Sequence, residues 1–353
     1  MKKNNSMPSE KAIYTLADSA TSKTERTTEM QVRTLLGKGT DLTDKQALKG
    51  RAKRKLTAQA LCVWVASELE KRGEHELART FWNTFHCQRV LVGHKGRIHG
   101  KYCKNKFCPL CASIRKAEII NRYLPVIQTW EDPHFVTLTQ KSVPAQKLEL
   151  WFSGVNKAFR QIKNKYRKQS QRGGEIKFMG IKCLECNFNP SRRTYNPHLH
   201  LIVPNKAMAE LLIKEWQMKW TEKYTSPLAQ HYRPVGNLER DLVEIIKYGS
   251  KIFTDFDKRD KGKMPPKIYV KALINIYKAM KSYRLFERFG FDLPKQEKNG
   301  IKTVIPANQC KDFVYAPEVY DWVDTKNGEG LTGYAPSALL EWLLTENVDT
   351  DLE

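Results

Sequence analysis

The stretch TYNPHLHLIV, Thr194–Val203, places two histidines one residue apart in an otherwise apolar run. The run is strand-like, and side chains two residues apart on a strand project from the same face. His198 and His200 therefore share one face of the expected strand, while Leu199 and Leu201 point to the other. Two adjacent imidazoles can bind one divalent cation. The alternative is an ordinary amphipathic strand with two solvent-facing histidines.

The preceding run EIKFMGIKCLECNF, at 175–188, is the expected hairpin partner of this strand. In such a hairpin Glu185 would lie beside the two histidines. A carboxylate with two imidazoles suits Mg or Mn acting on a phosphate. An exposed strand glutamate is the alternative. Cys183 and Cys186 are three residues apart, so we expect them on opposite faces, as strand cysteines rather than a metal pair.

The sequence DLVEIIKYGSK lies in an expected helix at 238–251 and contains a candidate nucleophile. Glu244 and Tyr248 are four residues apart, and Tyr248 and Lys251 are three apart, so all three share one helix face. A phenol, whose free pKa is about 10, is a weak nucleophile unless a cation stabilises the phenolate. Lys251 and a metal-polarised phosphate would supply that stabilisation. The alternative is a half-buried tyrosine on a helix with surface Glu and Lys.

Four cysteines at 87–111 have the spacing C-x15-C-x4-C-x2-C: Cys87, Cys103, Cys108 and Cys111. A Cys-x-x-Cys pair with two further thiolates at loop distance is typical of tetrahedral structural zinc. One of the neighbouring histidines could replace a thiolate: His86, His94 or His99. A redox Cys-x-x-Cys is the competing interpretation. The two additional cysteines and the flanking Lys and Arg favour zinc.

The chain of 353 residues has 61 Lys and Arg against 38 Asp and Glu, a net charge of +23, which favours a polyanionic partner. Its N-terminus lacks an apolar signal segment, and no apolar run approaches the roughly 18–20 residues of a membrane span. We therefore expect a cytoplasmic protein whose cysteines are thiols or metal ligands. Candidate DNA-phosphate contacts lie on a basic helix at 145–171, for which a merely solvated face is the alternative: Lys157, Arg160, Lys163, Lys165, Arg167 and Lys168. The sign of these charges and a nearby site favour phosphate contact.

Hydrophobic periodicity predicts an α+β fold, with an antiparallel sheet covered by helices. The expected elements, besides the hairpin and the helix at 238–251, are helices at 56–72, 145–171 and 206–224 and a strand at 134–140. The expected regions are a flexible basic arm at 1–55, a helix with a Cys-rich module at 56–130, a catalytic domain at 131–260 and a C-terminal region of unclear role at 261–353.

Three motifs, FVTLTQ, PHLHLIV and EIIKYGSK, resemble in order and distance those of HUH endonucleases. The likeness is greatest to the rolling-circle replication initiator (Rep) proteins of small bacterial plasmids, in the group with one catalytic tyrosine and a glutamate four residues before it. The resemblance covers about 85–251. It implies an HUH-type central antiparallel sheet flanked by helices, with a small zinc-binding module inserted before it. CKNKFCPLC resembles the Cys-rich stretch that precedes the first motif in these initiators.

The resemblance also implies an activity, that of a metal-dependent single-stranded DNA endonuclease and strand transferase. His198 and His200 would hold Mg or Mn over the scissile phosphate, and Glu185 matches a carboxylate that some members place on the neighbouring strand. Tyr248 would form a 5′-phosphotyrosine and leave a 3′-OH primer, and Glu244 would activate water for the terminating cleavage. Implied partners are a single-stranded or hairpin plasmid origin and the host helicase and polymerase. Alternatives are an HUH transposase, a mobilisation relaxase or a non-catalytic zinc-containing DNA-binding regulator.

Overall fold

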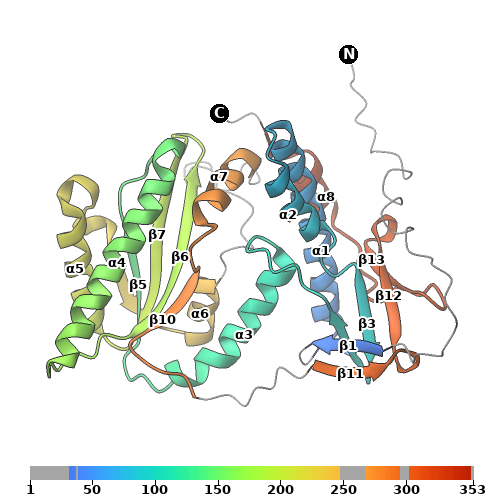
Figure 1. Cartoon of the computed structure of the whole chain (residues 1–353), viewed down its shortest axis with the longest axis horizontal. Coiled ribbons are helices and arrows are strands. Elements are labelled where there is room, and N and C mark those ends of the chain that lie inside the picture. Colours follow the sequence, from blue (N-terminus) through green and yellow to red (C-terminus); the bar gives the residue numbers. More distant parts are fainter. Residues whose placement is uncertain (1–31, 37–38, 247–266, 295–301, 351–353) are drawn as a thin grey trace, which may run out of the picture.

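A computed structural model describes residues 32–36, 39–246, 267–294 and 302–350. Within these residues, two five-stranded sheets lie side by side with helices around and between them, which confirms the expected α+β class (Figure 1). The first, called here the histidine sheet, has the antiparallel order β10-β6-β7-β5-β8. Its strands are β5 (His134–Thr139), β6 (Gly180–Asn189), β7 (Thr194–Val203), β8 (His231–Pro234) and β10 (Phe286–Phe289). The hairpin predicted from the sequence is β6–β7.

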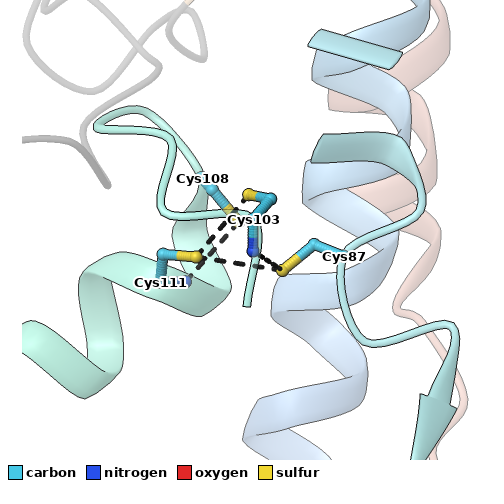
Figure 2. Close-up of side chains that lie close together, drawn as sticks. All are labelled: Cys87, Cys103, Cys108 and Cys111. Atoms are coloured by element: carbon cyan, nitrogen blue, oxygen red, sulfur yellow. Dashed lines mark hydrogen bonds between the residues drawn. The ribbon is translucent and has the colours of Figure 1, made fainter. Parts of the chain in front are cut away.

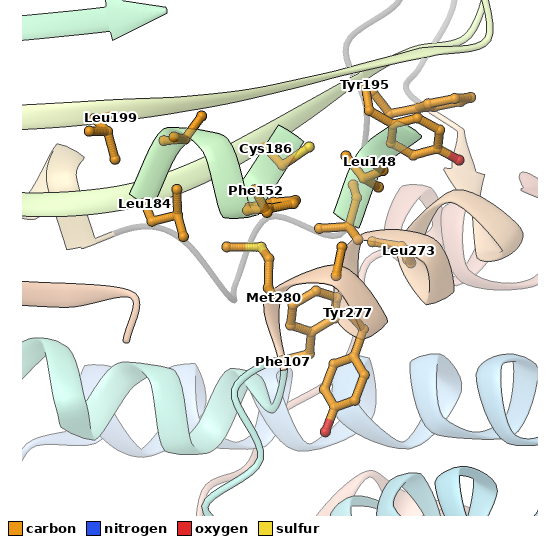
Figure 3. Close-up of a cluster of buried hydrophobic side chains, with 14 of the residues drawn as sticks. Phe107, Leu148, Phe152, Leu184, Cys186, Tyr195, Leu199, Leu273, Tyr277 and Met280 are labelled. Atoms are coloured by element: carbon orange, nitrogen blue, oxygen red, sulfur yellow. The ribbon is translucent and has the colours of Figure 1, made fainter. Parts of the chain in front are cut away.

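One face of the histidine sheet packs against three helices: α4 (Leu148–Gln171), α5 (Lys206–Tyr224) and α7 (Val270–Met280). Leu184 and Leu199 are directly paired across β6 and β7 and point into this core. Figure 3 shows them close to Phe152 of α4 and Met280 of α7. Apolar side chains of the helix expected at 145–171 are buried here, among them Phe152, Phe159 and Ile162, and a 3-10 turn at Ala145–Lys147 precedes the α-helix.

The opposite face of the histidine sheet is covered by α3 (Pro109–Ile127) and α6 (Leu238–Ile246). Tyr123 and Ile127 of α3 form a smaller core with Leu242 of α6 and with two sheet residues, Ile181 and Ile202. The apolar side of the helix at 238–246 therefore packs against this face of the sheet through Leu242. The side chains of the histidines project from this face, because Ile202 and His200 are two residues apart on β7.

The second sheet has the order β13-β12-β3-β4-β2. Its strands are β2 (Thr40–Asp41), β3 (Val90–His94), β4 (Arg97–Gly100), β12 (Lys311–Ala316) and β13 (Asp321–Asp324). It packs against α1 (Lys45–Lys71), which in turn packs against α2 (His75–Phe85). The remaining elements are β1 (Val32–Leu36) paired with β11 (Lys302–Pro306), β9 (Ile268–Tyr269) paired with β14 (Val348–Asp349), α8 (Ala338–Thr345), and 3-10 turns at Pro227–Ala229, Ala307–Gln309 and Pro317–Val319.

The first long helix begins well before the residue expected from the sequence, at Lys45 instead of residue 56. The carboxylate of Asp44 caps it by accepting a hydrogen bond of 2.9 Å from the backbone N–H of Ala47. Leu48 and Ala52 in its first turns are fully buried against the second sheet. The part of the chain expected as an arm therefore already contributes to a core by residue 48; residues 1–31 lie outside the described residues.

The C-terminal region contributes to both sheets. β10 is an edge strand of the histidine sheet and pairs with β6, with Phe286 opposite Cys183. β12 pairs with β3, the strand that follows Cys87. The boundary expected at residue 260 is therefore crossed by strand pairing, which sequence periodicity does not reveal. No helix among the described residues is long and apolar enough to cross a membrane.

Candidate active site and metal centres

The β6–β7 hairpin brings Glu185 and the two histidines together, as expected from the sequence. Glu185 is paired in register with His198, and Cys183 with His200. One carboxylate oxygen of Glu185, Oε2, lies 3.5 Å from Nε2 of each histidine. The two Nε2 atoms are 3.2 Å apart. Three atoms that can each donate a lone pair thus converge on one point, and together they could hold a metal ion.

The Nδ1 atoms of both histidines, which point away from Glu185, have hydrogen-bond partners. Nδ1 of His198 lies 2.9 Å from the backbone carbonyl oxygen of Asn196. A carbonyl only accepts, so this Nδ1 carries the proton and the Nε2 lone pair is available. Nδ1 of His200 lies 3.1 Å from Oγ1 of Thr137, which can accept from the same tautomer. This arrangement points both Nε2 atoms toward Glu185, where each can donate to the carboxylate as N–H or offer a lone pair to a metal ion, and outer hydrogen bonds orient metal-binding histidines in this way.

The electrostatics of this group favour a cation. Burial raises the pKa of Glu185, but its hydrogen bonds and charge interactions with His198 and His200 outweigh burial and lower the pKa to about 2. Glu185 is therefore a carboxylate at neutral pH. The side chains of Glu185 and His198 are 12% and 5% exposed, whereas that of His200 is 19% exposed. A ligand would therefore enter beside His200.

Two polar residues beside this group were not singled out from the sequence. Thr137 is paired with His200, and His231 of β8 is paired with Thr137 on its other side, so the three side chains project from the same face. His231 is exposed. Thr137 alternates with apolar neighbours within FVTLTQ, and this alternation is a signal that could have identified it. Nothing in the short β8 sequence indicates His231.

The helix expected to carry the nucleophile is described only up to Ile246. Glu244 is exposed on α6, while Tyr248 and Lys251 lie outside the described residues. α6 is attached to the sheet by an ion pair, in which Nη1 of Arg233 on β8 lies 3.0 Å from Oδ2 of Asp241 and Nη2 contacts Oδ1. The hydrogen bond to Asp241, together with the nearby charges of Asp241 and Glu244, raises the pKa of Arg233 against the opposing effect of burial. The two partners come from separate elements, so local sequence patterns did not identify them.

The four cysteines predicted to bind zinc form one cluster (Figure 2). Sγ of Cys111 lies 3.6 Å from Sγ of Cys103 and 3.8 Å from Sγ of Cys87. Tetrahedral zinc with Zn–S bonds of about 2.3 Å requires sulfur atoms about 3.8 Å apart. Backbone N–H groups support two of the sulfurs, from Cys103 to Cys87 and from Cys111 to Cys108, each at 3.5 Å. The spacing and the sulfur geometry therefore fit a structural zinc ion.

The ligands of this cluster come from three places in the fold. Cys87 follows α2, Cys103 lies in the loop after β4, and Cys108 and Cys111 form the N-cap and first turn of α3. Because the four thiols suffice, no histidine has to replace one; the candidate substitutes stay outside the cluster: His86, His94 and His99. Beside the cluster, the buried ammonium of Lys55 donates to the carbonyls of Phe85 and Cys87, at 2.7 and 2.9 Å.

The loop between the second and third cysteines contacts the core below the histidine sheet. The ammonium of Lys106 donates to three carbonyls at the end of α7 and beyond it, those of Met280, Lys281 and Tyr283, at 3.0, 2.6 and 2.7 Å. The neighbouring Phe107 is buried against Tyr277 of α7, with ring centroids 5.0 Å apart (Figure 3). The cysteine cluster is thus joined to the core of the histidine sheet.

The basic helix predicted to contact DNA lies on the other side of the histidine sheet. α4 packs on the face opposite His198 and His200, so the assumption that it lies near their site is wrong. Lys163 pairs with Glu287 at 3.6 Å, and Lys165 pairs with Glu215. The remaining basic side chains of the set are exposed: Lys157, Arg160, Arg167 and Lys168.

Within the part of the chain that the structure describes, the fold and the two clusters define an α+β protein with a candidate ion site on a sheet and a candidate zinc centre. A family profile described as Replication protein matches residues 95–284. A protein named Protein rep from Staphylococcus aureus is 32% identical over 165 residues, which cover 42% of this chain and 69% of the relative. The chain belongs to this family of replication proteins, and this confirms the resemblance to plasmid Rep initiators.

Other relatives are more distant. Proteins named Protein rep from Bacillus amyloliquefaciens and Streptococcus pneumoniae are 25% and 27% identical over 146 and 164 residues, which cover 39% and 41% of this chain. The matched part spans only 41% and 47% of these two relatives. No solved structure matches the chain.

Proposed function

We propose that the protein initiates rolling-circle plasmid replication by nicking one strand of the origin and joining itself to the cut end. Family membership supports a role in plasmid replication. One observation supports the chemistry most directly: Glu185 Oε2 lies 3.5 Å from both Nε2 atoms of His198 and His200, on a sheet face with its open side at His200. A hydrolytic or transesterification site for phosphate esters is the function that suits such a group best.

The side chains of Glu185, His198 and His200 would hold Mg or Mn. The ion would polarise the scissile phosphate and offset the charge that develops on it. Asn196 and Thr137 keep the imidazoles in the orientation and tautomer that ligation requires. The negative charge of Glu185 raises the affinity of the group for a cation.

The nucleophile would be Tyr248, which follows the last described residue of α6 by two positions. Tyr248 attacks as the phenolate, after its proton has passed to solvent. Its oxygen forms a bond to phosphorus, the bond from phosphorus to the 3′ oxygen breaks, and the released oxygen takes up a proton from solvent to become the 3′-OH primer. Lys251 stabilises the phenolate. The phosphotyrosine conserves the bond energy for rejoining. In the terminating cleavage Glu244 accepts a proton from the attacking water.

The other parts of the chain would support this reaction. Zinc held by the four cysteines would stabilise the loop that contacts α7. The exposed cations of α4 would contact phosphates of a part of the origin that does not enter the site, since that helix lies on the opposite face of the sheet. The single-stranded or hairpin origin is the substrate, and host helicase and polymerase would extend the 3′-OH.

The test is covalent capture of a labelled single-stranded oligonucleotide from a cognate plasmid origin in the presence of Mn or Mg. Wild-type protein should form an adduct that resists denaturation, and Tyr248→Phe should form none. Glu244→Ala should form the adduct but fail to release it by hydrolysis. A wild-type protein that binds the origin yet forms no adduct with either metal would refute the proposal and favour a regulator; normal hydrolytic release by Glu244→Ala would refute the role of Glu244.

A further inference from the structure

An ion pair fastens α6 to the edge of the histidine sheet. The guanidinium of Arg233 on β8 contacts both carboxylate oxygens of Asp241 on α6, with one distance of 3.0 Å. Such two-point pairing fixes orientation as well as distance, because the guanidinium and the carboxylate are both planar. The side chain of Asp241 is only 9% exposed, so solvent has little access to its side of the pair.

The same guanidinium also connects to the candidate metal ligands. It lies 4.8 Å over the ring of Phe135, to which Arg233 is paired in register between β5 and β8. The ring of Phe135 lies 5.3 Å from that of His200. Asp241, Arg233, Phe135 and His200 therefore form an unbroken series of contacts from the helix to the candidate metal ligand.

We propose that Arg233 and Asp241 are positioning residues, which fix the helix that precedes Tyr248 on the sheet face that carries the proposed metal ligands. This inference rests on the proposed nicking function, since it assigns the pair a role in that reaction. Leu242 and Leu238 also attach α6 to the sheet through apolar contacts, and apolar contacts are not directional. An ion pair that is half exposed on the arginine side contributes little to stability, whereas a displacement of about 1 Å can slow a reaction about 100-fold.

The opposite edge of the same sheet offers a matched control. Arg288 on β10 pairs in register with Ile181 and makes an ion pair of 3.2 Å with Asp292. Arg288 and Arg233 thus end the same row of residues at the two edges of the sheet. Asp292, however, is 99% exposed and belongs to no element that carries a proposed site residue. Asp292→Asn removes one carboxylate charge, as Asp241→Asn does, but leaves the contacts of α6 unchanged.

The first arm of the test measures whether α6 is held in place, by amide hydrogen exchange of the full-length protein without DNA or metal. Asp241→Asn should accelerate exchange of the amides at 238–246 about threefold, because the helix opens more often when a partly exposed ion pair is lost. Exchange in β7 should stay unchanged, and Asp292→Asn should behave as wild type. Unchanged exchange of α6 in Asp241→Asn would overturn the inference, whatever the protein does to DNA.

The second arm measures single-turnover adduct formation and oligonucleotide affinity with saturating Mn. Asp241→Asn should form the adduct about 100-fold more slowly, with a Kd within about threefold of wild type. The exchanged pair, Arg233→Asp with Asp241→Arg, should recover at least about tenfold of the lost rate. A normal rate in Asp241→Asn, or a loss of affinity as large as the loss of rate, would overturn the inference. Absence of any adduct in wild type refutes the proposed nicking function instead, and the exchange arm then decides whether the pair holds α6.

Discussion

The two candidate metal sites are built in different ways. Glu185, His198 and His200 lie on two adjacent strands of one hairpin, where the register of β6 and β7 brings them together. The four cysteines come from the end of α2, a loop and the start of α3. Backbone pairing positions the first set with or without an ion. The second set comes from segments that no strand pairing holds in register at the cluster, so we expect ion binding to contribute directly to local folding there.

The two sites also differ in how completely the protein surrounds the ion. Four thiolates complete a tetrahedral zinc shell, which is typical of a structural site. Three ligands with an accessible His200 leave positions for a substrate, which is typical of a catalytic site. We therefore expect substitutions in the cysteine cluster to affect folding, and substitutions in the histidine group to affect ion binding and chemistry.

The largest expected effect is that of Cys108→Ser. Loss of one thiolate should release the zinc and detach the loop that carries Lys106 and Phe107, so the apparent melting temperature should fall by about 10 °C or more. Metal analysis and thermal unfolding measure both changes. Cys310→Ser, at a buried cysteine outside the cluster, is the control and should keep its zinc. A zinc-free Cys108→Ser protein with wild-type stability would contradict the structural role.

His200→Ala should have the opposite profile, with nearly normal folding and much slower chemistry. Removing one of three ligands should lower Mn affinity and slow adduct formation by about 1000-fold or more, while the melting temperature changes by only a few degrees. Calorimetric Mn titration and the adduct assay measure these effects. His231→Ala is the matched control, because His231 is an exposed histidine of the same sheet face outside the ligand group. Equal effects of His200→Ala and His231→Ala on Mn affinity and adduct formation would contradict the assignment of His200 as a metal ligand.

A smaller effect concerns the metal-free protein at acid pH. The pKa of Glu185 lies at about 2, below its ordinary value of 4.5, so ionised Glu185 stabilises the folded state above about pH 4.5. This contribution, at most about 3 kcal/mol, is lost as the pH falls from about 4.5 to 2. Urea unfolding at several pH values should therefore show a steeper acid loss in wild type than in Glu185→Gln. If the free energies of unfolding of wild type and Glu185→Gln fall in parallel as the pH falls, the proposed interaction of ionised Glu185 with the two histidines is contradicted.

The smallest expected effect is that of Thr137→Val, which removes the hydroxyl that contacts Nδ1 of His200. Outer hydrogen bonds of this kind contribute about 10-fold to 100-fold to metal affinity, and we expect the lower value because the valine keeps the packing. Calorimetric Mn titration measures the loss. Thr137→Ser retains the hydroxyl and should restore most of the affinity; a Thr137→Ser protein as weak as Thr137→Val would point to packing instead.

The sequence by itself determined the local parts of this protein. Alternation on a strand predicted that His198 and His200 share a face, and hairpin geometry predicted Glu185 beside them, because both are consequences of a two-residue repeat. Cysteine spacing predicted the second cluster, since ligands in short loops are close whatever the rest of the fold does. The roles of Tyr248 and Lys251 stay predictions, because both lie outside the described residues.

Only the tertiary structure decided which segments meet across the fold. It put basic α4 on the face away from the histidines, paired β12 with β3, and brought Arg233 to Asp241. Periodicity identifies a helix and its apolar side but not which face of a sheet that side will cover. That choice depends on chain connectivity and on the packing of the whole core, which no local pattern contains.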